Sequence, residues 1–264
     1  MPETKLDRRT DGRGGPPVCL SFTVRGPWGH FRRVEGNIVK QTYGIVPRTT
    51  VAGLTAAILG LDRDSYYELF ASESSAIAIE PVRPIRTMNM PMNTLSTANE
   101  HIQTIPSRGK GLKVGLPDPS KPRQQHNYEV LADPAYRIDL WLDDDEHRTR
   151  LRTLLEEGKS HYVPSLGLSE HLAEVEYHGT FDVEPGPDDD RVDVDSAVID
   201  AVERIVPEPD CRHHIERSPA FMERDGRHRR TTGYRSVVYS PDAESLAVTD
   251  VETSLVDGRV VMFG

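Results

Sequence analysis

The sequence predicts an α+β fold in which one larger domain is followed by a small, mainly β unit. Three observations support it. Between residues 18 and 183, segments with strand and helix patterns follow one another in the order β-α-β-β-α-β. A long segment at 96–125 has no helical period and interrupts the series around the third strand. An acidic linker at 185–191 precedes residues 192–264. This order is that of the ferredoxin-like fold, which RNA-binding domains also use.

Composition narrows the functional classes. The 264-residue chain has 42 acidic and 32 basic residues, a net charge of −10, and only two cysteines, Cys19 and Cys211. The residues before the first strand, 1–17, are polar and read as a disordered arm, and no apolar run is long enough to span a membrane. We expect a reducing, cytoplasmic setting. An acid-rich, lysine-poor composition is typical of proteins that work in a salt-adapted cytoplasm.

The charge is unevenly distributed along the chain. Residues 1–48 have a net charge of +5, residues 83–137 of +4 and residues 142–210 of −14. A protein with this distribution can present one positive groove on an acidic background, so nucleic acid remains a candidate ligand.

The first strand is predicted at 18–24, and a glycine–proline loop follows it. This loop and the residues after it contain cations and rings that suit an RNA strand, because arginines bind phosphates and rings stack on bases. The candidates are Arg25, Trp28, His30, Arg32 and Arg33. The alternative is that Trp28 anchors the core and the arginines are solvated.

The next element is a buried helix of small and aliphatic residues at 51–59, stopped by Gly60. Thr49 or Thr50 is predicted to cap its N-terminus. With Arg48 beside them, these residues form a candidate seat for a phosphate at the positive end of the helix. The alternative is that the threonines only cap and Arg48 points to solvent. A short second helix is predicted through residues 66–70.

Two strands are predicted at 75–82 and 83–95, pairing as a hairpin, before the glycine-rich insertion at 96–125. Glycines between the cations permit a hairpin that folds over a nucleic-acid strand; the alternative is a solvated, disordered loop. The candidate RNA-binding residues in and after this insertion are Arg108, Lys110, Lys113, Arg123, Gln124, His126 and Tyr128.

Strands at 128–131 and 136–142, a helix from about 143 to 157, and a strand at 171–183 complete the larger domain. The C-terminal unit contains the densest positive cluster, a candidate extension of the RNA path or a hairpin tip facing acidic residues. Its members include Arg227, Arg229 and Arg230. The run from Cys211 to His214 has no zinc-site spacing, so no metal and no cofactor is predicted.

Four blocks resemble a known family in order: FTVRGPWGHFR, VPRTTVAGLTAAILGLDRDSYYELF, QQHNYEVLADPAYRIDLWL and HYVPSLGLSEHLAEVEY. They resemble the RAMP-superfamily, "family five" CRISPR-associated protein, the subunit of type I Cascade complexes that caps the 5′ handle of the guide RNA. The type I-B form of haloarchaea is the nearest match, over residues 18–183. The block that contains Arg48–Thr50 is the most specific.

The resemblance implies a ferredoxin-like domain with a β-hairpin thumb, matched here by 96–125. It implies that the loop Arg25–Arg33 and the helix entrance Arg48–Thr50 contact the 5′ handle. The implied partners are CRISPR RNA, the backbone-forming subunit and the large subunit, with target DNA met only indirectly and no membrane. Relatives of type I-C also cut precursor RNA with a Tyr, Lys and His set, which no motif places in this chain.

We therefore predict a non-catalytic RNA-binding subunit. The alternative is a metal-independent endoribonuclease that processes precursor CRISPR RNA, since such an enzyme needs only a base near a ribose 2′-hydroxyl. A third reading is a salt-adapted RNA-binding domain unrelated to CRISPR.

Overall fold

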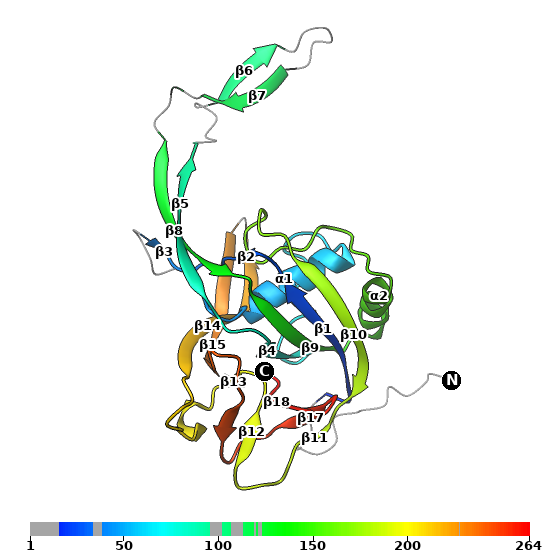
Figure 1. Cartoon of the computed structure of the whole chain (residues 1–264). Helices are drawn as coiled ribbons and strands as arrows, with labels where there is room; N and C mark the ends of the chain where they lie inside the picture. Colours follow the sequence, from blue (N-terminus) through cyan, green and yellow to red (C-terminus); the bar gives the residue numbers. More distant parts are fainter. Residues whose placement is uncertain are drawn as a thin grey trace, which may run out of the picture.

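The computed structural model describes residues 16–33, 39–95, 102–106, 113–118, 120, 123–226 and 228–264 (Figure 1). Nearly all of the predicted N-terminal arm lies outside the described residues.

An antiparallel four-stranded sheet forms the centre of the molecule. Its spatial order is β10-β1-β9-β4. In chain order, the sheet and its helices are β1 (Val18–Arg25), α1 (Arg48–Leu59), β4 (Ser75–Pro81), β9 (Ala135–Leu142), α2 (Asp145–Glu156) and β10 (Glu174–Asp182). The predicted alternation of strands and helices is therefore present.

The main core lies between this sheet and the two helices. Alternate residues of β1, Leu20, Phe22 and Val24, join Leu54 of α1 and Leu151 of α2 in one buried cluster. Alternation puts the intervening β1 residues on the other face, since side chains of a strand point to opposite sides. There β1 meets the C-terminal segment, because Cys19 packs with Val256 and Val261.

Helix α1 begins differently from the prediction. Pro47 occupies the N-cap position with no side-chain cap, and the N–H groups of Thr50 and Val51 donate to its carbonyl oxygen. The prediction that Thr49 or Thr50 caps the helix is wrong, because both residues already lie inside its first turn. Gly60 ends the helix in the left-handed region with φ 73°, as predicted.

The segment after α1 also departs from the prediction. The predicted second helix through 66–70 is wrong, because residues 67–70 form a turn. Helix α2 agrees better with its pattern: the Asp144 carboxylate caps it by accepting from the His147 N–H, and Gly158 follows its end with φ 60°.

A long two-stranded ribbon extends from the body of the molecule (Figure 1). It consists of β5 (Thr87–Thr94) and β8 (Gln124–Ala132), with β6 (Ile102–Pro106) and β7 (Lys113–Pro117) paired at its far end. We call this ribbon the thumb. The predicted hairpin between 75–82 and 83–95 is wrong, because β5 pairs with β8 and β4 pairs with β9. The thumb thus begins earlier than residue 96.

Short strands join the thumb to the body. β2 (Trp28–Gly29) pairs with the end of β8, and β3 (Val39–Lys40) pairs with its middle. The loop after β1 therefore lies at the base of the thumb.

The remaining strands come from the C-terminal part of the chain. They are β11 (Glu184–Pro185), β12 (Val192–Val194), β13 (Val198–Ile199), β14 (His214–Asp225), β15 (His228–Tyr239), β16 (Leu246–Val248), β17 (Ser254–Val256) and β18 (Arg259–Val261), with a 3-10 turn, η2, at Val202–Arg204. Val237 and Tyr239 of β15 belong to the same buried cluster as β1 and α1. This part therefore shares the core of the larger domain.

Candidate nucleic-acid interface

One face of the thumb collects rings, thioethers and a lysine at its base. Along β8, His126 and Tyr128 are two residues apart and so share a face. Cross-strand partners share that face: Met92 lies opposite His126, and Met90 opposite Tyr128. On the other edge of β8, Lys40 is the partner of Tyr128. We call this surface the aromatic face.

Trp28 continues the aromatic face toward the body. It pairs with Ala132, which has the same parity along β8 as Tyr128, and its side chain is half-buried. Partly exposed rings beside a cation offer stacking and phosphate contact in one place, the combination that proteins use to bind single-stranded nucleic acid.

His30 supports this surface from beneath. Its ring is buried, its Nδ1 lies 2.8 Å from the carbonyl oxygen of Glu129, and its centroid lies 5.1 Å from that of Tyr128 at 69°. Burial lowers the pKa of His30, so the ring is neutral at neutral pH. The structure thus places His30 where it orients Tyr128. The ring of His126 also lies near that of Tyr128, at 6.3 Å between centroids.

The three arginines of the β1–β3 region have different surroundings. Arg25 pairs with Glu174 and Glu176 of β10, with N–O distances of 3.1 and 3.3 Å. Arg33 pairs with the buried Glu216 and lies over the ring of Tyr43. Arg32 is exposed and has no ion-pair partner among the described residues. Arg32 is thus the arginine of this group whose charge is least neutralised.

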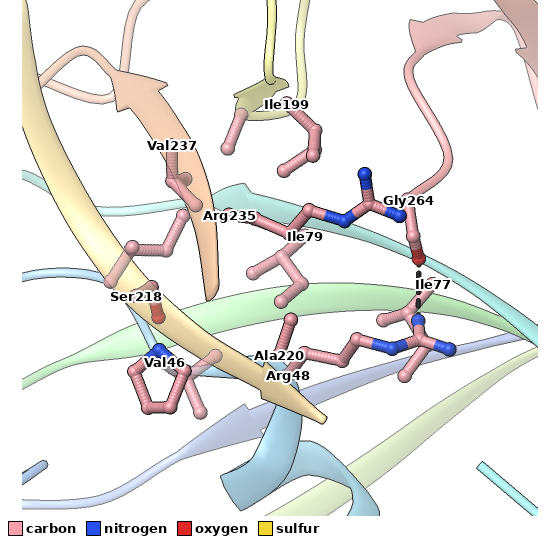
Figure 2. A pocket seen from close by; sticks show the side chains of 13 residues that line it. Val46, Arg48, Ile77, Ile79, Ile199, Ser218, Ala220, Arg235, Val237 and Gly264 are labelled. Carbon is pink, nitrogen blue, oxygen red and sulfur yellow. Dashed lines mark hydrogen bonds between the residues drawn. The ribbon is translucent and has the colours of Figure 1, made fainter. Parts of the chain in front are cut away.

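Arg48 does not form the predicted phosphate seat. Its guanidinium is buried and donates to main-chain oxygens of Gly264, Phe70 and Ser75 and to the Ser75 hydroxyl. Figure 2 shows the Arg48 side chain directed at Gly264, with Arg235 nearby. Burial and the charge of Arg235 lower the pKa of Arg48 to about 10, so it stays protonated at neutral pH. The alternative, that Arg48 points to solvent, is also wrong.

The small cavity beside Arg48 is mainly apolar. It has a volume of about 30 Å³, and its walls include Ile45, Ile79, Val237 and Ser218, whose hydroxyl has no hydrogen-bond partner among the described residues (Figure 2). A space of this size holds a water molecule and no nucleotide. Thr49 and Thr50 are half-buried on the first turn of α1.

The other candidates lie in two regions that the structure does not bring together. Arg123 is exposed just before β8, Lys113 is the first residue of β7, and Gln124 is the first residue of β8. Arg229 pairs with Asp64 and Arg230 with Glu223, at the tip of the β14–β15 hairpin. Arg108, Lys110 and Arg227 lie outside the described residues.

Sequence reasoning missed two features of this surface. Lys40 was not selected, since only its pairing with β8 brings it beside Tyr128. The methionines were missed too, although TMNMPMNT alternates and so indicates a strand with one thioether face.

Within the described residues, no group of three or more His, Cys, Asp or Glu could hold a metal ion. No helix in that part of the chain is long and apolar enough to cross a membrane.

Comparison with protein families gives one match. The sequence profile described as "CRISPR-associated protein (Cas_Cas5)" matches residues 19–238, most of the chain. The chain belongs to the Cas5 family. No curated protein sequence matches this Cas5 chain.

One solved structure supports this assignment at the level of the fold, and two others are reported beside it. A CRISPR protein from Archaeoglobus fulgidus is 15% identical, with a TM-score of 0.52 over 94% of this chain and 99% of that one. A chain of a "CRISPR RNA-guided surveillance complex" is also 15% identical, with a TM-score of 0.49 over 90% and 91% of the two chains. A chain of a type III-B Cmr-beta complex is 11% identical, with a TM-score of 0.45 over 91% and 85%.

Proposed function

We propose that this Cas5 protein is a non-catalytic subunit of a type I CRISPR effector complex and binds the 5′ handle of the CRISPR RNA. The observation that carries the proposal is the aromatic face, where Trp28, His126 and Tyr128 lie beside Lys40 at the base of the thumb. The RNA would stack bases on these rings and place phosphates against Lys40 and Arg32.

The face of the central sheet that lies away from the two helices is a poor alternative for RNA. In many RNA-binding domains of this fold, the sheet itself carries the stacking rings. Here Arg259 of β18 pairs with Asp139 of β9 and Glu80 of β4 at 2.8 Å each, so the C-terminal strands cover this face. Beside them, Glu174 and Glu176 share one arginine, Arg25, so this group of three side chains keeps a net negative charge. Phosphates would be repelled there, which directs the RNA to the thumb.

The finer parts of the proposal follow the sequence resemblance. The antiparallel order β10-β1-β9-β4, with its helices between β1 and β4 and between β9 and β10, supports a ferredoxin-like assignment. We propose partners of two kinds, a backbone-forming subunit and the large subunit, in the type I-B system of a salt-loving archaeon. The cytoplasm is the setting, and target DNA is met only through the assembled complex.

The first test is purification of the tagged protein from its native host at high salt, with sequencing of the RNA that accompanies it. We expect short RNAs that share one repeat-derived 5′ end, together with other CRISPR subunits. Protein without RNA, or with a broad mixture of cellular RNA, would contradict the proposal.

A variant links the result to the aromatic face. Tyr128→Ala removes one stacking ring, which is worth about 1–3 kcal/mol per base, so we expect the affinity for handle RNA to fall roughly fivefold to 150-fold. Tyr162→Ala is the matched control, because Tyr162 is 51% exposed and lies in the loop before β10. Filter binding at several salt concentrations measures both. Equal affinity for the two variants would remove Tyr128 from the interface.

Endoribonuclease activity is a second candidate because an imidazole, a phenol and an ammonium group occur together. His126, Tyr128 and Lys40 share one face, and such groups could deprotonate a 2′-hydroxyl and stabilise the charged phosphate. Incubating the purified protein with precursor RNA and a chelator separates the candidates. Multiple-turnover cleavage that His126→Ala abolishes would replace the capping proposal with this one.

A further inference from the structure

A groove lies between β14 and the turns that follow α1. Its volume is about 720 Å³, and it shares no residue with the aromatic face. Apolar side chains of Phe70, Phe221 and Met222 are among its walls, as is Ala52 of α1. Five consecutive residues of β14, 220–224, line it, and a strand advances about 3.3 Å per residue, so this wall could lie along an extended chain of roughly five residues.

The strand that lines this groove is the edge of its sheet. The order β13-β15-β14 leaves one side of β14 unpaired, and residues 220–224 of that strand line the groove. In the described part of the chain, no main-chain hydrogen bond reaches residues 219–225 from outside the sheet. An edge of this kind offers free N–H and C=O groups to another strand.

The edge is held in place from behind. Phe221 lies opposite Gly233, where a Cβ would come within 2.8 Å of its ring. The guanidinium of Arg48 lies 5.0 Å from the centroid of the Phe221 ring. The register with β15 also shifts between Pro219 and Met222, and such irregularities re-aim a strand. The groove wall is thus formed before any partner arrives.

The charge of the groove favours a cationic occupant. Asp64, Glu68, Glu73 and Glu223 line it against a single arginine, Arg224. Arg229 and Arg230 neutralise Asp64 and Glu223. Glu68 is exposed and has no ion-pair partner among the described residues, so its charge is available to a ligand. The carboxylates disfavour a nucleic-acid strand.

We propose that an extended segment of a partner protein adds as a strand to the outer edge of β14. Its main chain would pair with residues 220–224, an apolar side chain would lie against Phe70 and Phe221, and a lysine or arginine would meet Glu68. Main-chain pairing gives affinity in this mode, and the pockets give specificity. The proposal does not depend on the RNA-binding function of the thumb.

The test uses the full-length protein within the complex purified from its host. A photo-crosslinking residue replaces Thr232, which is exposed and lines the groove. Hydrogen exchange then compares the amides of 220–224 in the complex and in the isolated full-length chain. The cross-linked segment is synthesised and titrated against the isolated chain carrying Glu68→Lys, with Glu203→Lys, on the exposed turn η2, as the matched control.

We expect a cross-link to one protein segment that contains a lysine or arginine, and slower exchange at 220–224 in the complex. Charge reversal at Glu68 should weaken the synthetic segment about tenfold, and Glu203→Lys should leave it unchanged. A cross-link to RNA would overturn the proposal. So would unchanged exchange at β14, or equal binding by the two variants, in an intact complex whose RNA content is normal.

Discussion

At the scale of single residues, the role that the sequence motif predicts for Arg48 differs from the role that its surroundings allow. The sequence places it beside a helix entrance, where a phosphate would be favoured. The fold turns its guanidinium inward, where Gly264, Phe70 and Ser75 accept its hydrogen bonds. A cation saturated in this way contributes to stability rather than to recognition.

Arg48→Met should therefore destabilise the protein. It leaves several buried acceptors unpaired, which costs about 2–4 kcal/mol of unfolding free energy. Urea denaturation measures the loss, and Arg63→Met, whose side chain is 80% exposed, should leave stability nearly unchanged. The folded fraction of Arg48→Met should still bind handle RNA. Loss of RNA binding with normal stability would restore the phosphate-seat interpretation.

Two buried histidines should make the stability of the protein depend on pH. Burial lowers the pKa of His30 and of His171. The unfolded chain then binds protons more readily than the folded one, so their contribution to stability is complete above the unfolded pKa of about 6.5 and is lost as pH falls below it. The urea midpoint of the natural chain should be lower at pH 5.5 than at pH 7.5. The midpoint of the double variant His30→Gln/His171→Gln should fall less over the same change of pH. An equal fall in both proteins would show that the folded chain protonates these rings as readily as the unfolded chain does.

At the scale of elements, two glycines that follow helices make a controlled comparison. Gly60 and Gly158 both have positive φ, 73° and 60°, after α1 and α2. A Cβ on Gly60 would lie 2.5 Å from Cγ of His161, whereas a Cβ on Gly158 would meet nothing within 4 Å. The two sites share the backbone cost of an L-residue and differ in crowding.

Gly60→Ala should therefore destabilise the protein more than Gly158→Ala. The left-handed conformation alone costs about 1–2 kcal/mol, which we expect for Gly158→Ala. Displacement of His161 adds to this cost for Gly60→Ala. Thermal unfolding of both variants provides the comparison, and equal shifts would mean that the loop at His161 yields freely.

At the scale of the whole molecule, the C-terminal strands and the central sheet form one unit. Arg259 of β18 holds Asp139, which is 1% exposed, and Glu80, which is half-buried. Burial raises the pKa of Glu80 despite the attraction of Arg259. This group of charges closes one face of the central sheet, the face on which many RNA-binding domains carry their stacking rings.

Removal of Arg259 should therefore be strongly destabilising. Arg259→Met leaves Asp139 buried without its cation, which costs about 3–5 kcal/mol. Arg259→Met combined with Asp139→Asn should cost less than the sum of the single changes, because the uncompensated charge disappears. Urea denaturation of the four proteins in this cycle measures the coupling. Additive effects would show that the pair contributes no net interaction.

The sequence by itself determined the features that depend on neighbouring residues. The strand and helix order from Val18 to Asp182 and the stop at Gly60 follow from periodicity and turn chemistry. Four blocks in that order also pointed to the family that the profile match shows. These predictions were confirmed because each depends on a short stretch of neighbouring residues.

Only the tertiary structure decided which distant segments meet. Strand β5 pairs with β8 rather than with β4, and this choice sets the length of the thumb and its aromatic face. Lys40 reaches Tyr128 through pairing across a long loop, and Arg48 finds its acceptor at Gly264. Strand pairing depends on burial and register over the whole sheet, so no local pattern specifies it. The candidate residues were therefore partly predictable, while their arrangement into a surface was not.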